Sequence, residues 1–194
     1  MRILVKLGVA LLVALLLGVG SALYLINAGL RHGSVTNGPW VTNPSIGSVN
    51  ADPYTRAAVA RAGLLALDKS ETIYFTAATD GAGHPLMTDC TYKLTGRDLP
   101  ARWWSITVYG ADHYLIPNPQ GKYSISKNSI KRARDGSYTA IVSAVPSDGN
   151  WIPTGTHDDP APFSLTIRLY NPEAAAYENL ESLDLPTITE EACP

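Results

Sequence analysis

The sequence predicts a mainly β protein: an antiparallel β-sandwich or jelly roll with one packed N-terminal helix, preceded by a single transmembrane helix. After Lys69, short runs of β-branched and aromatic residues alternate with turn residues. A helix-forming stretch follows Asp52, and an uncharged apolar run occupies residues 7–26. Short strands at this spacing, without helices between them, favour a sandwich over an α/β fold.

The apolar run Leu7–Ile26 is long enough to cross a hydrocarbon core of about 30 Å as a helix. Arg2 and Lys6 precede it, and such cations tend to stay on the cytoplasmic side. A secretory signal peptide usually has a shorter apolar region closed by small residues, for which Val19–Ser21 is the best match here. We therefore expect an uncleaved anchor in the bacterial inner membrane, with the C-terminal domain in the periplasm, and a cleaved signal as the alternative.

The expected organisation has four parts along the chain. They are a cytoplasmic tail (1–6), a transmembrane helix (7–26), a linker (27–51) and a β-sandwich domain (52–194). Residues 27–194 carry 13 basic and 17 acidic residues, a formal charge of −4. This balance argues against a nucleic-acid partner.

The linker assignment rests on a Gly-, Asn-, Ser- and Pro-rich composition without apolar periodicity. Within it, Trp40 is expected to dock on the domain or to lie at the membrane interface. Asp52 and Pro53 then resemble a helix N-cap and first helical residue, which predicts a helix over residues 53–68.

The strands are predicted from runs of strand-forming residues. They are residues 72–78, 86–94, 103–109, 123–125, 138–145 and 163–170. From Phe163 to Tyr170 apolar and polar residues alternate strictly, as expected for a strand with one buried and one wet face.

The two cysteines, Cys90 and Cys193, are far apart in the sequence, which excludes a C-x-x-C redox or zinc motif. In an oxidising compartment they are candidates for a disulfide that holds the C-terminal tail on the domain. Two unrelated thiols are the alternative.

Several longer motifs carry a family resemblance. They are residues 52–57 (DPYTRA), 92–109 (YKLTGRDLPARWWSITVY), 115–119 (LIPNP), 149–153 (GNWIP) and 165–172 (LTIRLYNP). In this order they resemble the bacterial family known as domain of unknown function 1214, over roughly Asp52 to Pro172. The resemblance implies a jelly-roll-like sandwich, and no established activity comes with it. In longer relatives another uncharacterised domain precedes this one, and Gly110 stands where the family's turn is expected to be acidic.

The candidate binding residues are aromatic, amide or cationic side chains within these motifs. They are Arg102, Trp103, Trp104, Tyr109, Asn118, Trp151 and Arg168. Neighbouring residues of a strand face opposite ways, so one indole of the Trp pair enters the core and the other is left for the opposite face. An exposed indole with Tyr109, Asn118 and Trp151 would form an aromatic platform for a sugar; burial of both indoles is the alternative. Arg168 stands out as a charge inside an otherwise uncharged strand.

Common catalytic signatures are absent from the sequence. There is no G-x-S-x-G elbow, no phosphate loop and no H-x-H pair among the isolated His32, His84, His113 and His157. We therefore expect neither a metal site nor a cofactor.

These observations favour an accessory or binding domain for an envelope glycan or a protein partner. The alternative is an enzyme acting on carbohydrate or a small polar substrate, with Asp89, Tyr109 or Arg168 in its site. Paired carboxylates at turns leave this alternative open.

Overall fold

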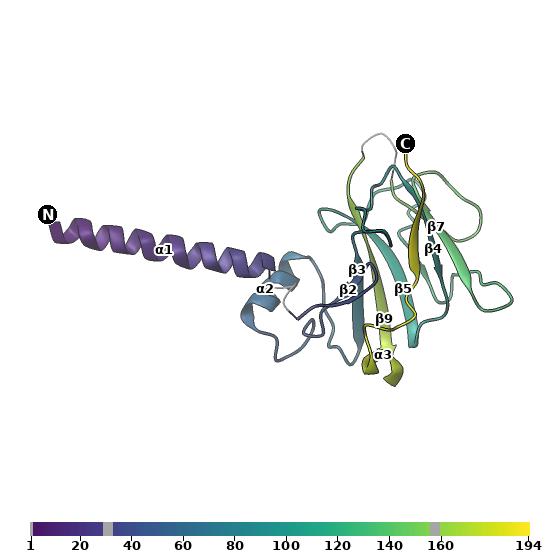
Figure 1. Ribbon diagram of the computed structural model, residues 1–194, viewed down its shortest axis with the longest axis horizontal. Coiled ribbons are helices and arrows are strands. Elements are labelled where there is room, and N and C mark those ends of the chain that lie inside the picture. Colours follow the sequence, from purple (N-terminus) through teal and green to yellow (C-terminus); the bar gives the residue numbers. More distant parts are fainter. Residues whose placement is uncertain (1, 29–32, 156–159) are drawn as a thin grey trace.

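The computed structural model describes residues 2–28, 33–155 and 160–194 of the chain. The elements are α1 (Arg2–Ala28), β1 (Val35–Asn37), β2 (Trp40–Thr42), α2 (Pro53–Arg61), β3 (Thr72–Ala77), β4 (Thr91–Gly96), β5 (Ala101–Gly110), β6 (Ser124–Ser126), β7 (Tyr138–Ser143), β8 (Trp151–Pro153), β9 (Phe163–Pro172), α3 (Ala174–Glu178) and β10 (Thr187–Ala192). Figure 1 shows α1 extending away from a body built of strands.

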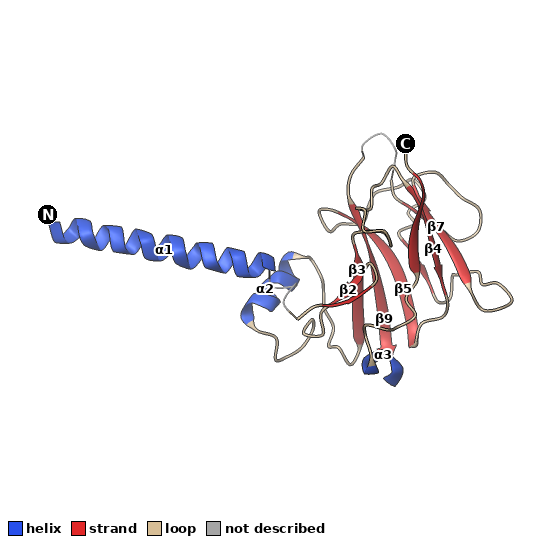
Figure 2. Cartoon of the chain, in the orientation of Figure 1, coloured by secondary structure: helices blue, strands red, loops and turns tan. Residues whose placement is uncertain are grey.

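Two sheets form the body, which confirms the predicted mainly β sandwich (Figure 2). The larger sheet has the strand order β1-β2-β3-β9-β5-β6, and the smaller has β10-β4-β7-β8. All pairs are antiparallel except β7 with β8, which run parallel. The sandwich is thus mostly antiparallel, as expected, and its parallel pair arises because the chain between β7 and β8 crosses over instead of closing a hairpin.

The core lies between the sheets, and strand alternation selects its members. On β9, Phe163, Leu165, Ile167 and Leu169 are buried, as the alternating pattern predicts. Tyr92 of the smaller sheet meets Phe163 edge to face, with ring centroids 5.8 Å apart. The opposite face of β9 is therefore free to carry polar side chains.

The predicted linker contains part of the folded domain. β1 and β2 pair with each other, and Val41 of β2 pairs with Thr76 of β3, so both strands extend the larger sheet. The Trp40 side chain is 1% exposed, and its indole N–H donates to the carbonyl oxygen of Pro186 at 2.7 Å. Trp40 thus docks on the domain, and the sandwich begins before Asp52.

Helix α2 begins where predicted and ends earlier. The Asp52 carboxylate accepts hydrogen bonds from the backbone N–H groups of Tyr54 and Thr55, and Pro53 occupies the first turn. Beyond Arg61 the chain leaves the helix, and Gly63 takes a positive φ of 65°. A glycine in this conformation stops the helix, so the residues up to Asp68 form a loop.

The C-terminal tail adds β10, which the sequence did not predict. β10 pairs with β4 from Thr187 to Ala192, and Cys90 and Cys193 are joined by a disulfide with their Cα atoms 4.3 Å apart. Figure 1 shows the C-terminus at the same end of the body as the start of β4.

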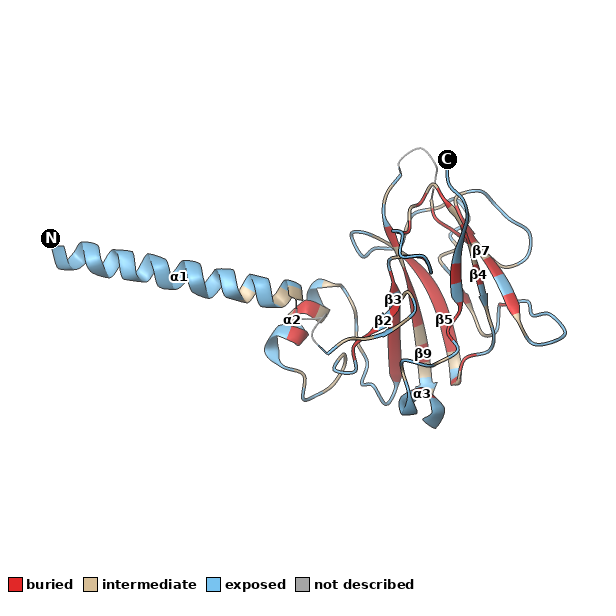
Figure 3. Cartoon of the chain, in the orientation of Figure 1, coloured by how far each residue is buried: buried red, intermediate tan, exposed pale blue. Residues whose placement is uncertain are grey.

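Helix α1 is long and apolar enough to cross a membrane. It is exposed along almost its whole length (Figure 3), and none of its described residues is buried. Length and composition are equally those of an N-terminal signal sequence.

Candidate functional site

The alternation of β5 separates the two indoles of the Trp pair. Trp104 points into the core and is 0% exposed, whereas Trp103 lies on the outward face and is half-buried. Trp104 stacks on Tyr138, with centroids 5.6 Å apart. Only Trp103 is therefore available for a platform.

Arg168 occupies the middle of the outward face of the larger sheet. Its strand, β9, lies between β3 and β5, and its register places Tyr74 on one side and Ser105 on the other. Directly opposed residues of neighbouring strands project to the same face. The guanidinium is thus framed by side chains from three strands that are distant in the sequence.

Two tyrosines hold the Arg168 guanidinium. It donates a hydrogen bond of 2.8 Å to the Tyr109 hydroxyl, and its central carbon lies 5.3 Å from the Tyr109 ring centroid and 6.0 Å from that of Tyr74. These distances are typical of cation–π contacts. Among the described residues, no carboxylate forms an ion pair with Arg168. A guanidinium carries five N–H donors, so most of its capacity is left for another acceptor.

A second aromatic pair lies next along the same face. Trp103 and Tyr170 are cross-strand neighbours, with ring centroids 5.2 Å apart. Small hydroxyl residues, Ser105, Thr107 and Thr166, form the floor between the large side chains. We refer to Tyr74, Trp103, Tyr109, Arg168 and Tyr170 as the outer-face site.

The other sequence candidates lie elsewhere. Trp151 is 7% exposed in the smaller sheet, and its indole N–H donates to Ser143, so it forms no platform with Trp103. Asn118 fixes its own loop, since its amide bonds the backbone of Ile116 and Lys122. Arg102 lies exposed at the start of β5.

The residues of the alternative enzyme hypothesis are divided between different parts of the sandwich. Asp89 precedes β4 of the smaller sheet, whereas Tyr109 and Arg168 lie on the outward face of the larger one. The fold therefore brings the last two together without the carboxylate.

Sequence reasoning missed Tyr74 as a site residue. The period of two along β3 would place it on the polar face with Thr72 and Thr76. Its position opposite Arg168 follows only from the pairing of β3 with β9, in which these two residues are 94 positions apart in the chain.

A hollow of about 180 Å³ adjoins the site through Tyr74. Residues of β2, β3 and α3 line it, together with Lys69. The Thr72 hydroxyl is buried there and has no hydrogen-bond partner among the described residues. The hollow gives the outward face a recess at its β3 side.

Two groups of described side chains have a spacing suited to a metal ion, and one of them contains the disulfide-bonded Cys90 and Cys193. Ligand atoms of Asp80, His84 and Glu190 all lie within 4.8 Å of one another. One oxygen of the buried Asp80 carboxylate accepts hydrogen bonds from the backbone N–H groups of Ala82 and His84. These bonds stabilise the turn after β3, which explains the carboxylate without a metal ion.

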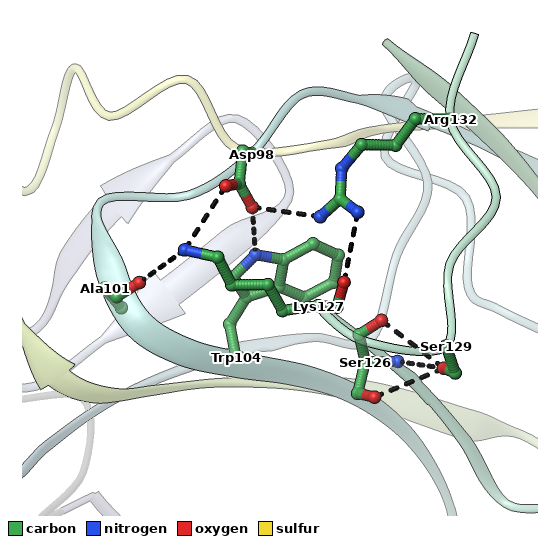
Figure 4. A network of polar contacts seen from close by, with 7 residues as sticks. All are labelled: Asp98, Ala101, Trp104, Ser126, Lys127, Ser129 and Arg132. Atoms are coloured by element: carbon green, nitrogen blue, oxygen red, sulfur yellow. Dashed lines mark hydrogen bonds and ion pairs between the residues drawn. The ribbon is translucent and has the colours of Figure 1, made fainter. Parts of the chain in front are cut away.

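A polar network closes one edge of the sandwich around Trp104 (Figure 4). The Asp98 carboxylate accepts a hydrogen bond of 2.7 Å from the Trp104 indole N–H, and it forms ion pairs with Lys127 at 3.2 Å and Arg132 at 3.1 Å. Lys127 also donates to the Ala101 carbonyl at 2.8 Å. The network ties the loop before β5 to the segment after β6.

The pKa of the Asp98 carboxyl lies below its usual value of 3.8. Burial by itself would raise this pKa, but the hydrogen bond from Trp104 and the contacts with Lys127 and Arg132 lower it by more. A carboxyl whose pKa is lower in the folded state stabilises the fold above its unfolded pKa, and this contribution is lost as the pH falls through the folded value.

Replacing Asp98 by Asn is therefore expected to lower the melting temperature at pH 7, because the ion pairs are lost. The deficit should begin to shrink as the pH falls below about 4, where the carboxyl of the unfolded chain protonates, and it should be smallest below the lower pKa of the folded state, where the native carboxyl is protonated as well. Melting curves of both proteins from pH 7 to pH 2 measure this. Asp148→Asn, at a carboxylate without an ion pair among the described residues, is the matched control, and a deficit independent of pH would contradict the assignment.

Comparison with known proteins gives the family. The family model "Protein of unknown function (DUF1214)" matches residues 71–174. The chain belongs to this family. The resemblance stated from the motifs is thereby confirmed, and the DUF1214 match contains β3 to β9 with the whole outer-face site.

Comparison with solved structures supports the fold through one match with a TM-score above 0.5. The chain is similar to the VPA0106 protein from Vibrio parahaemolyticus, with a TM-score of 0.59 and 24% identity over 74% of this chain and 36% of that one. An uncharacterised protein from Burkholderia cenocepacia matches with a TM-score of 0.39 and 20% identity, over 64% of this chain and 31% of that one. This DUF1214 chain thus spans about a third of the length of either structure. No curated protein matches it.

Proposed function

We propose that this protein is a membrane-anchored binding domain whose outer-face site takes an acidic glycan of the bacterial envelope. The anchor in this proposal is α1, which is long and apolar enough to cross a membrane. Arg2 and Lys6 at its start favour a cytoplasmic N-terminus, with the sandwich on the periplasmic side. A disulfide between Cys90 and Cys193 suits that compartment.

The observation that carries the binding proposal is the environment of Arg168. A half-buried guanidinium has aromatic rings beside it and no carboxylate partner among the described residues. Arginine binds carboxylates through paired, charge-assisted hydrogen bonds. An acidic ligand would therefore complete the set of interactions that this face leaves open.

The aromatic rings favour a saccharide as the carrier of that acid group. Tyrosine and tryptophan offer a flat apolar face together with a polar atom, which suits rings with both C–H and hydroxyl groups. Trp103 and Tyr170 provide such faces next to Arg168, and the hydroxyls of Ser105 and Thr107 lie between. A sugar that bears a carboxylate matches both halves of the site.

The test measures binding of the full-length protein, in detergent, to a uronic-acid oligosaccharide and to a neutral one of equal length. We expect saturable binding of the acidic probe and much weaker binding of the neutral one. Arg168→Ala should weaken acidic binding by about tenfold or more, since a hydrogen bond to a charged group contributes about 1.5–3 kcal/mol.

Arg102→Ala is the matched control, because it removes an exposed arginine of the neighbouring strand outside the site. It should leave binding unchanged. Equal binding by the Arg168 and Arg102 variants, or a failure of both probes to bind, overturns the glycan proposal. Loss of a protein crosslink from cells on Arg168→Ala would instead identify a protein partner, and cleavage of the probe would identify an enzyme.

A further inference from the structure

Residues 45–67 carry large apolar side chains that the sandwich leaves in solvent. We call this stretch, which comprises a loop, α2 and the loop after it, the proximal segment. Its exposed large apolar residues are Val49 (77%), Tyr54 (41%), Leu65 (93%) and Leu67 (42%). A single exposed leucine is ordinary, but several large apolar side chains in one short segment form a patch whose exposure to water is unfavourable in free energy.

The two loops of the proximal segment, one before α2 and one after it, contact each other and α2. Arg56 donates hydrogen bonds to the carbonyl oxygens of Val49 and Ala51, which ties the first loop to α2. Gly47 lies so close to Leu67 that a β-carbon there would be 1.8 Å from the Leu67 carbonyl oxygen. Between the two loops lies a hollow of about 610 Å³, whose apolar lining residues include Val59, Leu64, Leu65 and Leu67. The patch is thus a formed surface with an apolar recess.

The proximal segment is held at the end of α1. Arg61 of α2 donates a hydrogen bond to the side-chain oxygen of Asn27, in the last turn of α1. Figure 1 shows α2 beside that end of the long helix, between it and the sheets. If α1 crosses a bilayer, the proximal segment lies where the chain leaves it.

We infer that the proximal segment is a membrane-contact surface, with Leu65 and Leu67 inserted at the boundary between headgroups and acyl chains of an anionic phospholipid bilayer. This inference rests on the proposed membrane anchor. Apolar residues gain free energy by leaving water, and interfacial segments combine them with cations that face anionic headgroups. Arg56 and Arg61 supply such cations within the same segment.

The consequence is a fixed orientation of the sandwich above the membrane. A single membrane-spanning helix fixes one point of the protein in the bilayer, whereas a second contact at the proximal segment restrains the rotation of the sandwich about that point. Effective concentration favours this contact, because α1 already holds the segment at the surface.

The test uses the full-length protein with one introduced cysteine that carries an environment-sensitive fluorophore. Both native cysteines are joined in the disulfide, so the introduced thiol is the reactive one. The labelled positions are Leu65→Cys in the proximal segment, Leu12→Cys in α1, and Asp148→Cys in the exposed loop between β7 and β8. Each protein is placed in vesicles of phosphatidylethanolamine and phosphatidylglycerol, with and without brominated acyl chains as quenchers.

We expect a blue-shifted emission and loss of intensity with brominated lipid for the Leu65 label, and neither for the Asp148 label. The Leu12 label reports the anchor independently. Strong quenching at position 12 with a water-like, unquenched signal at position 65 overturns the membrane-contact inference and leaves the anchor standing. No quenching at position 12 overturns the anchor and the inference together.

A second copy of this chain is the other occupant that the patch would suit. In that case the Leu65 label would be shielded without lipid quenching, and the shielding would disappear when the protein is diluted in the vesicles. This outcome overturns the inference. Because Leu65 is 93% exposed, the substitution does not disturb the core, and a failure to fold does not obscure the result.

Discussion

Replacing both Cys90 and Cys193 by serine is expected to lower the free energy of unfolding by about 3–5 kcal/mol. The disulfide closes a loop with a sequence separation of 103 residues. In the chain-entropy model, a loop of roughly 100 residues corresponds to about 4.7 kcal/mol of stabilisation. Urea unfolding of the oxidised protein and of the double variant, followed by far-ultraviolet circular dichroism, measures the difference.

The loss is expected to begin at the C-terminal strand. β10 is mostly exposed, and within the described structure it pairs with β4 alone. Without the disulfide it is held by the backbone hydrogen bonds at the sheet edge and by the one buried side chain of the strand, Ile188. Hydrogen exchange should become fastest in residues 187–192 of the variant. The reduced native protein is the control and should behave as the double serine variant does. Equal stability of oxidised and reduced protein would contradict the prediction.

Replacing Trp104 by alanine is expected to cost about 3–5 kcal/mol, the range for truncating a large buried aromatic residue. The indole is fully buried, stacks on Tyr138, and donates to Asp98 at 2.7 Å. Truncation therefore leaves a cavity between the sheets and removes one partner of the polar network. Trp104→Phe keeps most of the apolar volume, and its smaller loss should report the missing indole N–H.

Trp103→Ala is the matched control at the adjacent position. Its side chain is half-buried on the outward face, and its ring contact is with Tyr170. We expect a stability loss well below that of Trp104→Ala, together with weaker binding of the acidic oligosaccharide. Similar unfolding free energies for the two alanine variants would contradict the assignment of Trp104 to the core.

The strands with clear sequence patterns could be predicted because each carries its own signal. The alternation from Phe163 to Leu169 identifies both the strand and its buried face. β1, β2 and β8 have three residues each, too few for a period to appear, and they lack the run of strand-forming residues that predicted the equally short β6. Their burial depends on partners far along the chain, such as Pro186 for Trp40. A short segment is recruited as a strand by the edge that it meets, which composition does not reveal.

The candidate site was predictable in part. Arg168 stands out as a charge in an uncharged strand, and Tyr109 and Trp103 lie in a motif of the same family. Trp104 and Trp151 are as aromatic as Trp103, yet both are buried. Tyr74 gave no sign of its role, because only the order β3-β9-β5 places it opposite Arg168.

The apolar helix, the β class of the domain and its family can be predicted without coordinates, because hydrophobic run length, strand periodicity and motifs are local properties of the chain. The outward-facing indole, the tyrosines around Arg168 and the return of the tail to Cys90 become visible only in the folded chain. These depend on strand order and register, which are set by contacts between residues far apart in the sequence and by the free energy of closing the core between two sheets.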